Sequence, residues 1–123
     1  KKLKYLLKKD FLSFKNKDSF FAMTAHIIFN EIDRKNTVTH SKKMIEIIRK
    51  KIGFKNIIIS DDLSMKSLKG TIEENTIKTF NAGCNLALHC NGNYKEMEIV
   101  GKNSPIINKF TLKKTWQFYK FLG

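Results

Sequence analysis

The sequence contains few residues of several kinds, and each scarcity excludes a class of protein. Its 123 residues include two cysteines, one proline and one tryptophan. Cys84 and Cys90 cannot build a disulfide-rich secreted scaffold, and their spacing matches neither a redox pair nor half of a four-ligand zinc site. No uninterrupted apolar run reaches the roughly 18 residues of a membrane span. The lysine-rich start, residues 1–9, lacks the apolar stretch and small-residue site of a secretory signal. We therefore expect a reduced, cytoplasmic protein without a membrane segment.

Ligands for metal ions are equally sparse. The three histidines, His26, His40 and His89, are scattered along the chain, so their spacing does not indicate a metal site. We predict no metal and no cofactor.

Acidic residues are also scarce, because 11 Asp and Glu stand against 24 Lys and Arg, which gives a net charge of +13. Such an excess of positive charge favours an anionic partner such as nucleic acid. However, only Arg34 and Arg49 are arginines, and base readout and bidentate phosphate contacts favour the planar arginine side chain. The lysines are spread along the chain, as on solvated helix faces. A lysine-rich nucleic-acid-binding α/β module is therefore the alternative function.

The sequence does contain short apolar runs that alternate with amphipathic segments. Three runs have the composition of strands buried on both faces, at residues 19–25, 55–62 and 85–90. Helical spacing and caps predict helices at about residues 2–14, 41–53, 71–83, 95–100 and 112–121. Strands about 30 residues apart with helices between them indicate right-handed βαβ crossovers and a parallel sheet.

Local cap signals fix the ends of the two central helices. Ser41 is a plausible N-cap, and Gly53 stands where a left-handed C-cap glycine is common. Thr71, with Glu74 three residues later, is a capping-box signature, and Gly83 ends that helix.

In a parallel sheet the ligand site lies at the carboxyl ends of the strands. Those ends are residues 25–26, 60–62 and 89–90. Asp61 and Asp62 follow an uncharged strand, where a carboxylate can act as nucleophile, base or metal ligand. The alternative is that an aspartate caps the following turn. His26 and His89 are similarly ambiguous, because a strand-end histidine is often simply a hydrogen-bonded core residue.

Four linked segments share one order and spacing. They are Met23-Thr24-Ala25-His26-Ile27, Thr39-His40-Ser41, Gly53-Phe54 leading into Ile59-Ser60-Asp61-Asp62-Leu63-Ser64-Met65, and Asn81-Ala82-Gly83-Cys84-Asn85-Leu86. Together they resemble bacterial β-N-acetylglucosaminidases of glycoside hydrolase family 3. The resemblance covers about residues 10–91, and its most specific part is residues 59–65.

The resemblance implies a (β/α)8 barrel that removes N-acetylglucosamine from muropeptide fragments during cell-wall recycling in the cytoplasm, with retention of configuration. It implies that Asp61 is the nucleophile, a role that suits a strand-end carboxylate. His26 is then expected in the wall of the sugar site, with Met65 packed near it. Asp62 is expected to stabilise the site or its turn, and Asn85 stands where the family commonly has Asp.

Part of the family pattern is missing from this sequence. The acid/base histidine belongs to a Lys-His-Phe-Pro-Gly-His-Gly motif and a downstream Asp-Ser-His, and neither string occurs here. We therefore expect residues 1–123 to form the carboxyl-terminal half of the catalytic barrel, with about three parallel strands. The motifs occupy about residues 10–91, and a helical tail occupies about residues 93–123. Such a piece is expected to be inactive alone and to associate with an amino-terminal half or with itself.

A third interpretation starts from the acid pair alone. Receiver-like α/β domains hold Mg²⁺ with acids at a strand end. That function needs a third carboxylate at another strand end, and the ends near Ala25 and His89 offer none. The Mg²⁺-binding interpretation therefore ranks below the glycosidase.

Overall fold

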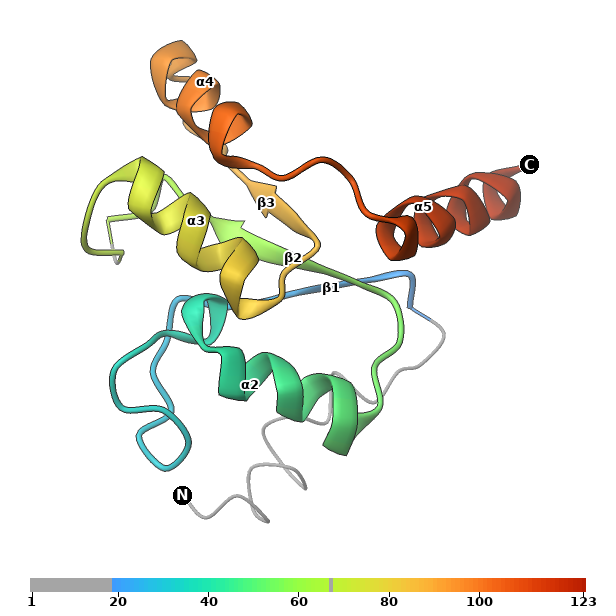
Figure 1. Ribbon diagram of the computed structural model, residues 1–123, viewed down its shortest axis with the longest axis horizontal. Coiled ribbons are helices and arrows are strands. Elements are labelled where there is room, and N and C mark those ends of the chain that lie inside the picture. Colours follow the sequence, from blue (N-terminus) through green and yellow to red (C-terminus); the bar gives the residue numbers. More distant parts are fainter. Residues whose placement is uncertain (1–18, 67) are drawn as a thin grey trace.

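Three parallel strands alternate with helices in the computed structural model, which describes residues 19–66 and 68–123 (Figure 1). The strands are β1 (Phe21–Met23), β2 (Ile57–Asp62) and β3 (Leu86–Leu88), in the order β1-β2-β3. The helices are the short 3-10 helix η2 (Val38–His40), α2 (Lys42–Ile47), its π-helical continuation η3 (Ile48–Ile52), α3 (Ile72–Ala82), α4 (Tyr94–Asn103) and α5 (Lys109–Leu122). The predicted parallel α/β arrangement is confirmed. The helix predicted at residues 2–14 lies outside the described residues.

The central helices begin and end where the cap signals predict. The Ser41 side chain accepts a hydrogen bond from the Met44 N–H at 3.1 Å, and Thr71 accepts one from the Glu74 N–H at 3.1 Å. Gly53 and Gly83 close their helices in the left-handed conformation. An ideal Cβ on Gly83 would lie 2.9 Å from the Ile45 side chain, so this position requires glycine for space as well as for φ.

Other boundaries differ from the expected ones. β1 and β3 are shorter than the apolar runs that predicted them, because only three residues of each run enter the ladder with β2. Helices α4 and α5 start earlier than expected, at Tyr94 and Lys109. In both helices an asparagine is the N-cap, since Asn93 accepts from the Glu96 N–H and Asn108 from the Thr111 N–H.

The register of β2 shifts just before its carboxyl end. β2 pairs with β1 regularly through Ile59, but between Ile59 and Asp62 it contains one more residue than the facing part of β3. This is a β-bulge, and the Ser60 Oγ accepts the Leu88 N–H at 2.9 Å beside it. The bulge therefore interrupts the ladder between β2 and β3 in the stretch from Ile59 to Asp62.

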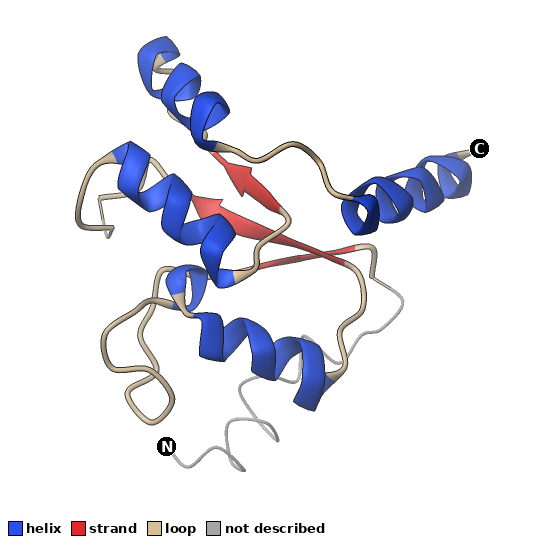
Figure 2. Cartoon of the chain, in the orientation of Figure 1, coloured by secondary structure: helices blue, strands red, loops and turns tan. Residues whose placement is uncertain are grey.

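Helices α2 and α3 pack beside one another against the sheet (Figure 2). Their apolar side chains form one buried core with the central strand, which contains Val38, Met44, Ile45, Ile48, Ile52, Phe54, Ile58, Ala82 and Cys84. Each Å² of apolar surface that is buried stabilises the fold by about 25 cal/mol, so this layer is the main source of stability. The core thus holds β2 rigidly between its two neighbouring strands.

Arg49 joins the end of the α2–η3 helix to the start of the sheet. Its Nη1 donates to the carbonyl oxygens of Phe54 and Asn56, and its Nη2 donates to the Asn85 Oδ1 at 2.7 Å. The same Oδ1 accepts the Ile58 N–H at 2.8 Å. Burial lowers the pKa of Arg49, and no carboxylate within residues 19–66 and 68–123 pairs with it.

Helix α5 projects from the rest of the chain near the start of β2 (Figure 1). Phe118 packs edge-on against Phe20 and Phe21, with ring centroids 5.1 and 4.9 Å apart. The opposite side of α5 leaves large apolar side chains exposed, among them Trp116 and Tyr119. Across the described part of the chain, every helix is too short or too polar to span a bilayer.

Candidate active site at the strand ends

The carboxyl ends of all three strands are joined by hydrogen bonds at Asp62. The His26 Nε2, after β1, lies 2.8 Å from the Asp62 carbonyl oxygen. The Cys90 N–H, after β3, donates to the Asp62 Oδ1 at 2.9 Å. The predicted convergence of the strand ends is therefore confirmed.

Asp61 is partly exposed, and its two carboxylate oxygens differ in surroundings. Oδ1 accepts the N–H of Asp62 at 2.8 Å, and the Asp61 N–H lies 3.3 Å from the Thr24 Oγ1. Oδ2 has no hydrogen-bond partner among the residues that the structure describes. One oxygen is thus held in place while the other is free to meet a ligand, an arrangement that suits a nucleophile.

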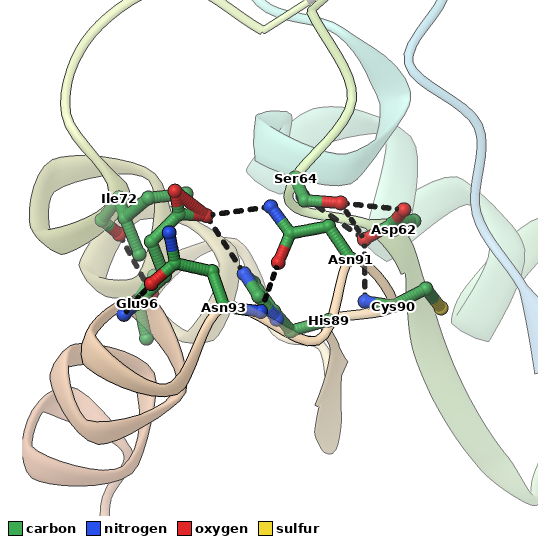
Figure 3. Close-up of polar contacts among 9 residues, drawn as sticks. Asp62, Ser64, Ile72, His89, Cys90, Asn91, Asn93 and Glu96 are labelled. Atoms are coloured by element: carbon green, nitrogen blue, oxygen red, sulfur yellow. Dashed lines mark hydrogen bonds and ion pairs between the residues drawn. The ribbon is translucent and has the colours of Figure 1, made fainter.

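Asp62 uses its carboxylate to hold the chain together (Figure 3). Its oxygens accept the Ser64 N–H at 3.0 Å, the Ser64 hydroxyl at 2.7 and 2.8 Å, and the Cys90 N–H. Desolvation alone would raise the pKa of Asp62, but these donors and the nearby His89 hold that pKa below its ordinary value. Asp62 therefore stabilises the turn after β2, as we expected from the sequence.

His26 has both ring nitrogens engaged. Nε2 meets the Asp62 carbonyl oxygen, and Nδ1 lies 2.9 Å from the Thr39 hydroxyl. A sugar beside His26 would consequently contact ring carbons, because the nitrogens already have partners. The position of His26 in the sugar-site wall stays a prediction.

Met65 lies in the turn after β2 and is 43% exposed. Its N–H donates to the Asp62 carbonyl at 3.2 Å, which places it close to the strand end. The side chain is available to a ligand, and its packing near His26 stays a prediction.

His89 is directed to helix α4 (Figure 3). Its side chain is only 5% exposed, and its Nε2 lies 2.9 Å from the Glu96 Oε1, which also accepts from the Asn91 side chain at 3.0 Å. These hydrogen bonds from His89 and Asn91 lower the pKa of Glu96. The pair anchors the loop between β3 and α4.

Sequence reasoning assigned no role to the buried hydroxyls beneath the strand ends. Thr24, Thr39 and Ser60 are all fully enclosed, and each donates or accepts a hydrogen bond near the β2 terminus. All three belong to the quoted family segments, which was the signal that could have singled them out. For metals, no group of three or more His, Cys, Asp or Glu side chains gathers within residues 19–66 and 68–123.

Comparison with known proteins decides the family. The model of the glycosyl hydrolase family 3 N-terminal domain matches residues 6–110. This chain belongs to glycoside hydrolase family 3. A β-hexosaminidase of Haemophilus influenzae (strain PittEE) is 37% identical to it over 90 residues, which are 68% of this chain and 26% of that relative. The resemblance inferred from the four segments is confirmed.

Solved structures of family members agree with the fold. Native NagZ from Neisseria gonorrhoeae superposes with a TM-score of 0.78 at 28% identity, over 96% of this chain and 34% of that one. The same protein in complex with N-trifluoroacetyl-D-glucosamine also gives 0.78 at 28% identity, over 96% of this chain and 35% of that one. The prediction of part of a parallel α/β barrel is confirmed. The chain spans about a quarter of the length of the curated relatives that it matches.

Proposed function

We propose that this chain carries the nucleophile of a retaining β-N-acetylhexosaminidase, and that Asp61 is that nucleophile. The observation that supports the proposal most directly is the contrast between the two adjacent aspartates. Asp62 uses both oxygens on Ser64 and Cys90, whereas Asp61 keeps Oδ2 free at the end of β2. Within the part of the chain that the structure describes, Asp61 is the member of the acid pair with an oxygen that no hydrogen bond occupies.

The chemistry follows from a carboxylate in that position. In the first step an oxygen of Asp61 bonds to the anomeric carbon, the bond from that carbon to the leaving group breaks, and the leaving oxygen takes a proton from a general acid. In the second step water bonds to the anomeric carbon, the ester to Asp61 breaks, and the water proton returns to the acid/base group. Two inversions at one carbon give overall retention.

The substrate proposed is a terminal N-acetylglucosamine on a muropeptide-like glycan, processed in the cytoplasm during peptidoglycan recycling. Support comes from the family assignment and from the Neisseria gonorrhoeae neighbour, which was solved with N-trifluoroacetyl-D-glucosamine. His26 and Met65 are proposed to line the sugar site, His26 through its ring carbons and Met65 through its exposed side chain.

The general acid is proposed to come from outside this chain. The acid/base motifs of the family do not occur in the sequence, and we propose that the chain is the carboxyl-terminal half of a barrel. Within the described residues, β1 and β3 are the outer strands of the sheet, so each has one unpaired edge. An amino-terminal half, or a second copy, is proposed to cover these edges.

Covalent trapping tests the nucleophile. The chain is incubated with a fluorinated N-acetylglucosaminyl fluoride, whose fluoride leaves without a general acid, and the adduct is located by peptide mass mapping. We expect one glycosyl adduct on Asp61. Asp61→Asn should abolish the adduct, whereas Glu73→Gln, the same chemical change on the exposed face of α3, should not. An adduct on another residue, or none at all, would contradict the assignment.

Turnover tests the missing acid. With an aryl N-acetylglucosaminide of poor leaving ability we expect the chain alone to show negligible hydrolysis, because general acid help contributes typically 10²- to 10⁴-fold. Robust turnover that Asp61→Asn abolishes would refute the proposal that the chain lacks its acid, while supporting Asp61.

A further inference from the structure

A circuit of hydrogen bonds links the Asp61 N–H to the Asp62 carbonyl oxygen, one on each side of the peptide that joins the two aspartates. The Asp61 N–H lies 3.3 Å from the Thr24 Oγ1, which lies 2.8 Å from the Thr39 Oγ1. The Thr39 Oγ1 lies 2.9 Å from the His26 Nδ1, and the His26 Nε2 lies 2.8 Å from the Asp62 carbonyl oxygen. The circuit therefore leaves the backbone at the Asp61 N–H and returns to it at the Asp62 carbonyl oxygen.

A neutral His26 ring gives every hydrogen bond of the circuit one direction. A carbonyl oxygen only accepts, so the His26 Nε2 must carry a proton. In the neutral ring Nδ1 is then an acceptor, and the Thr39 hydroxyl donates to it. Thr39 in turn accepts from the Thr24 hydroxyl, which accepts the Asp61 N–H. Every donor in the circuit has one acceptor.

A doubly protonated ring would reverse the direction of the hydrogen bond between His26 and Thr39. Nδ1 would then donate to Thr39, and the Thr39 hydroxyl would turn to the carbonyl oxygen of Ala25, 3.2 Å away. We take the ring to be the neutral Nε2–H tautomer, in which the Thr39 hydroxyl donates to Nδ1.

Burial makes these hydrogen bonds strong constraints. Thr24 is 3% exposed and Thr39 is fully buried, so water does not replace a lost partner. A buried hydroxyl or amide without a partner costs on the order of 1–3 kcal/mol. Because the register of β2 with β1 ends at Ile59, the circuit supplies beyond that point the restraint that regular strand pairing gives before it.

We propose that Thr39 and His26 are positioning residues for Asp61. Through the circuit they hold the Asp61 N–H and the Asp62 carbonyl oxygen, and so restrain the peptide between these two groups. The N–H of that peptide donates to the Asp61 Oδ1 at 2.8 Å and so sets the direction of Oδ2. The inference rests on the proposed nucleophilic role of Asp61. Misplacement of a reacting group by about 1 Å can cost 10²-fold in rate, so a hydroxyl remote from the sugar can control the reaction.

The test is ¹⁵N NMR of the full chain and three variants. Long-range ¹H–¹⁵N correlation of the wild type should show His26 as the Nε2–H tautomer. Thr39→Val removes the hydroxyl at nearly constant volume, and it should change the His26 ring signals and the Asp62 amide signal. Thr39→Ser should restore both. Thr76→Val is the matched control, because Thr76 is equally buried but donates only to the Ile72 carbonyl within α3.

The outcomes separate this proposal from the function on which it rests. A wild-type His26 with its proton on Nδ1 overturns the circuit, even if Thr39→Val fails to fold. Equal spectra at His26 for Thr39→Val and Thr76→Val overturn it as well. In the trapping experiment Thr39→Val should label Asp61 at least tenfold more slowly than Thr76→Val. If Thr39→Val and Thr76→Val are labelled at equal rates, the positioning role is refuted and the nucleophilic role of Asp61 stands. If the wild type is not labelled, both roles are refuted.

Discussion

Asn85 connects the core helix to the central strand through a single oxygen, and its replacement gives a sharp test of how the sheet is held. Its Oδ1 accepts from the Arg49 Nη2 at 2.7 Å and from the Ile58 N–H at 2.8 Å. Asn85→Leu keeps the branched shape at Cγ and removes the acceptor. A hydrogen bond to a charged group contributes about 1.5–3 kcal/mol and an unpaired buried N–H costs about 1–3 kcal/mol. After discounting for the partial exposure of Arg49, we expect a loss of about 2–4 kcal/mol.

We expect Asn85→Asp to raise the free energy of unfolding, whereas Asn85→Leu lowers it. The carboxylate keeps both acceptor contacts and gives Arg49 a counter-ion, which it lacks among the described residues. Charge-assisted hydrogen bonds are about twice as strong as neutral ones, and partial desolvation of the new carboxylate offsets part of this gain. We expect a net stabilisation of about 1 kcal/mol at pH 7. Pairing with Arg49 would lower the pKa of the new carboxyl, so the gain should be lost as the pH falls through that lowered value.

Urea unfolding followed by circular dichroism measures both changes as shifts of the midpoint at constant slope. Asn81→Asp is the control, because it makes the same change in net charge on the exposed side of α3. If Asn85→Asp destabilises the chain as much as Asn85→Leu, the Arg49 bridge does not act as described. An equal gain from Asn81→Asp would attribute the effect to net charge alone.

Three other predictions follow from the described contacts. Burial raises the pKa of the Cys84 thiol to about 12, whereas Cys90 is exposed. Ellman's reagent should therefore titrate one thiol in the native chain and none in Cys90→Ser. Two reactive thiols in the native chain would contradict this. Burial first, then nearby positive charge, lowers the pKa of His40 from 6.5 to about 4. The unfolded state therefore binds the extra proton between these values, and the free energy of unfolding should fall by about 1–2 kcal/mol, after screening, as the pH drops through that window. His40→Gln should flatten this dependence in urea titrations. Gly83→Ala should lower the unfolding free energy by about 1–3 kcal/mol, because φ is 116° and the added methyl would meet the α2 side chain; an unchanged urea midpoint would refute this.

Local chemistry explains which parts of the fold could be predicted. Ser41, Gly53, Thr71 and Gly83 act through hydrogen bonds and dihedral angles within one turn, so the sequence near each cap is sufficient. Strand length is different, because a residue belongs to a strand only when another segment pairs with it. The apolar run at residues 19–25 therefore predicted a strand, and its pairing with β2 reduced that strand to Phe21–Met23.

The candidate site was also predictable only in part. The sequence alone placed two acids at the end of a buried strand, and the order of four motifs indicated the family that the comparisons confirm. It could not distinguish Asp61 from Asp62 by local chemistry, since adjacent aspartates have nearly the same neighbours along the chain. The structure separates their surroundings, because Ser64 and the Cys90 N–H, 28 residues away, bind Asp62, whereas the Asp61 Oδ2 has no hydrogen-bond partner within residues 19–66 and 68–123. The Ser64 contacts to Asp62 are local, whereas the Cys90 contact joins segments distant in sequence and therefore exists only after folding.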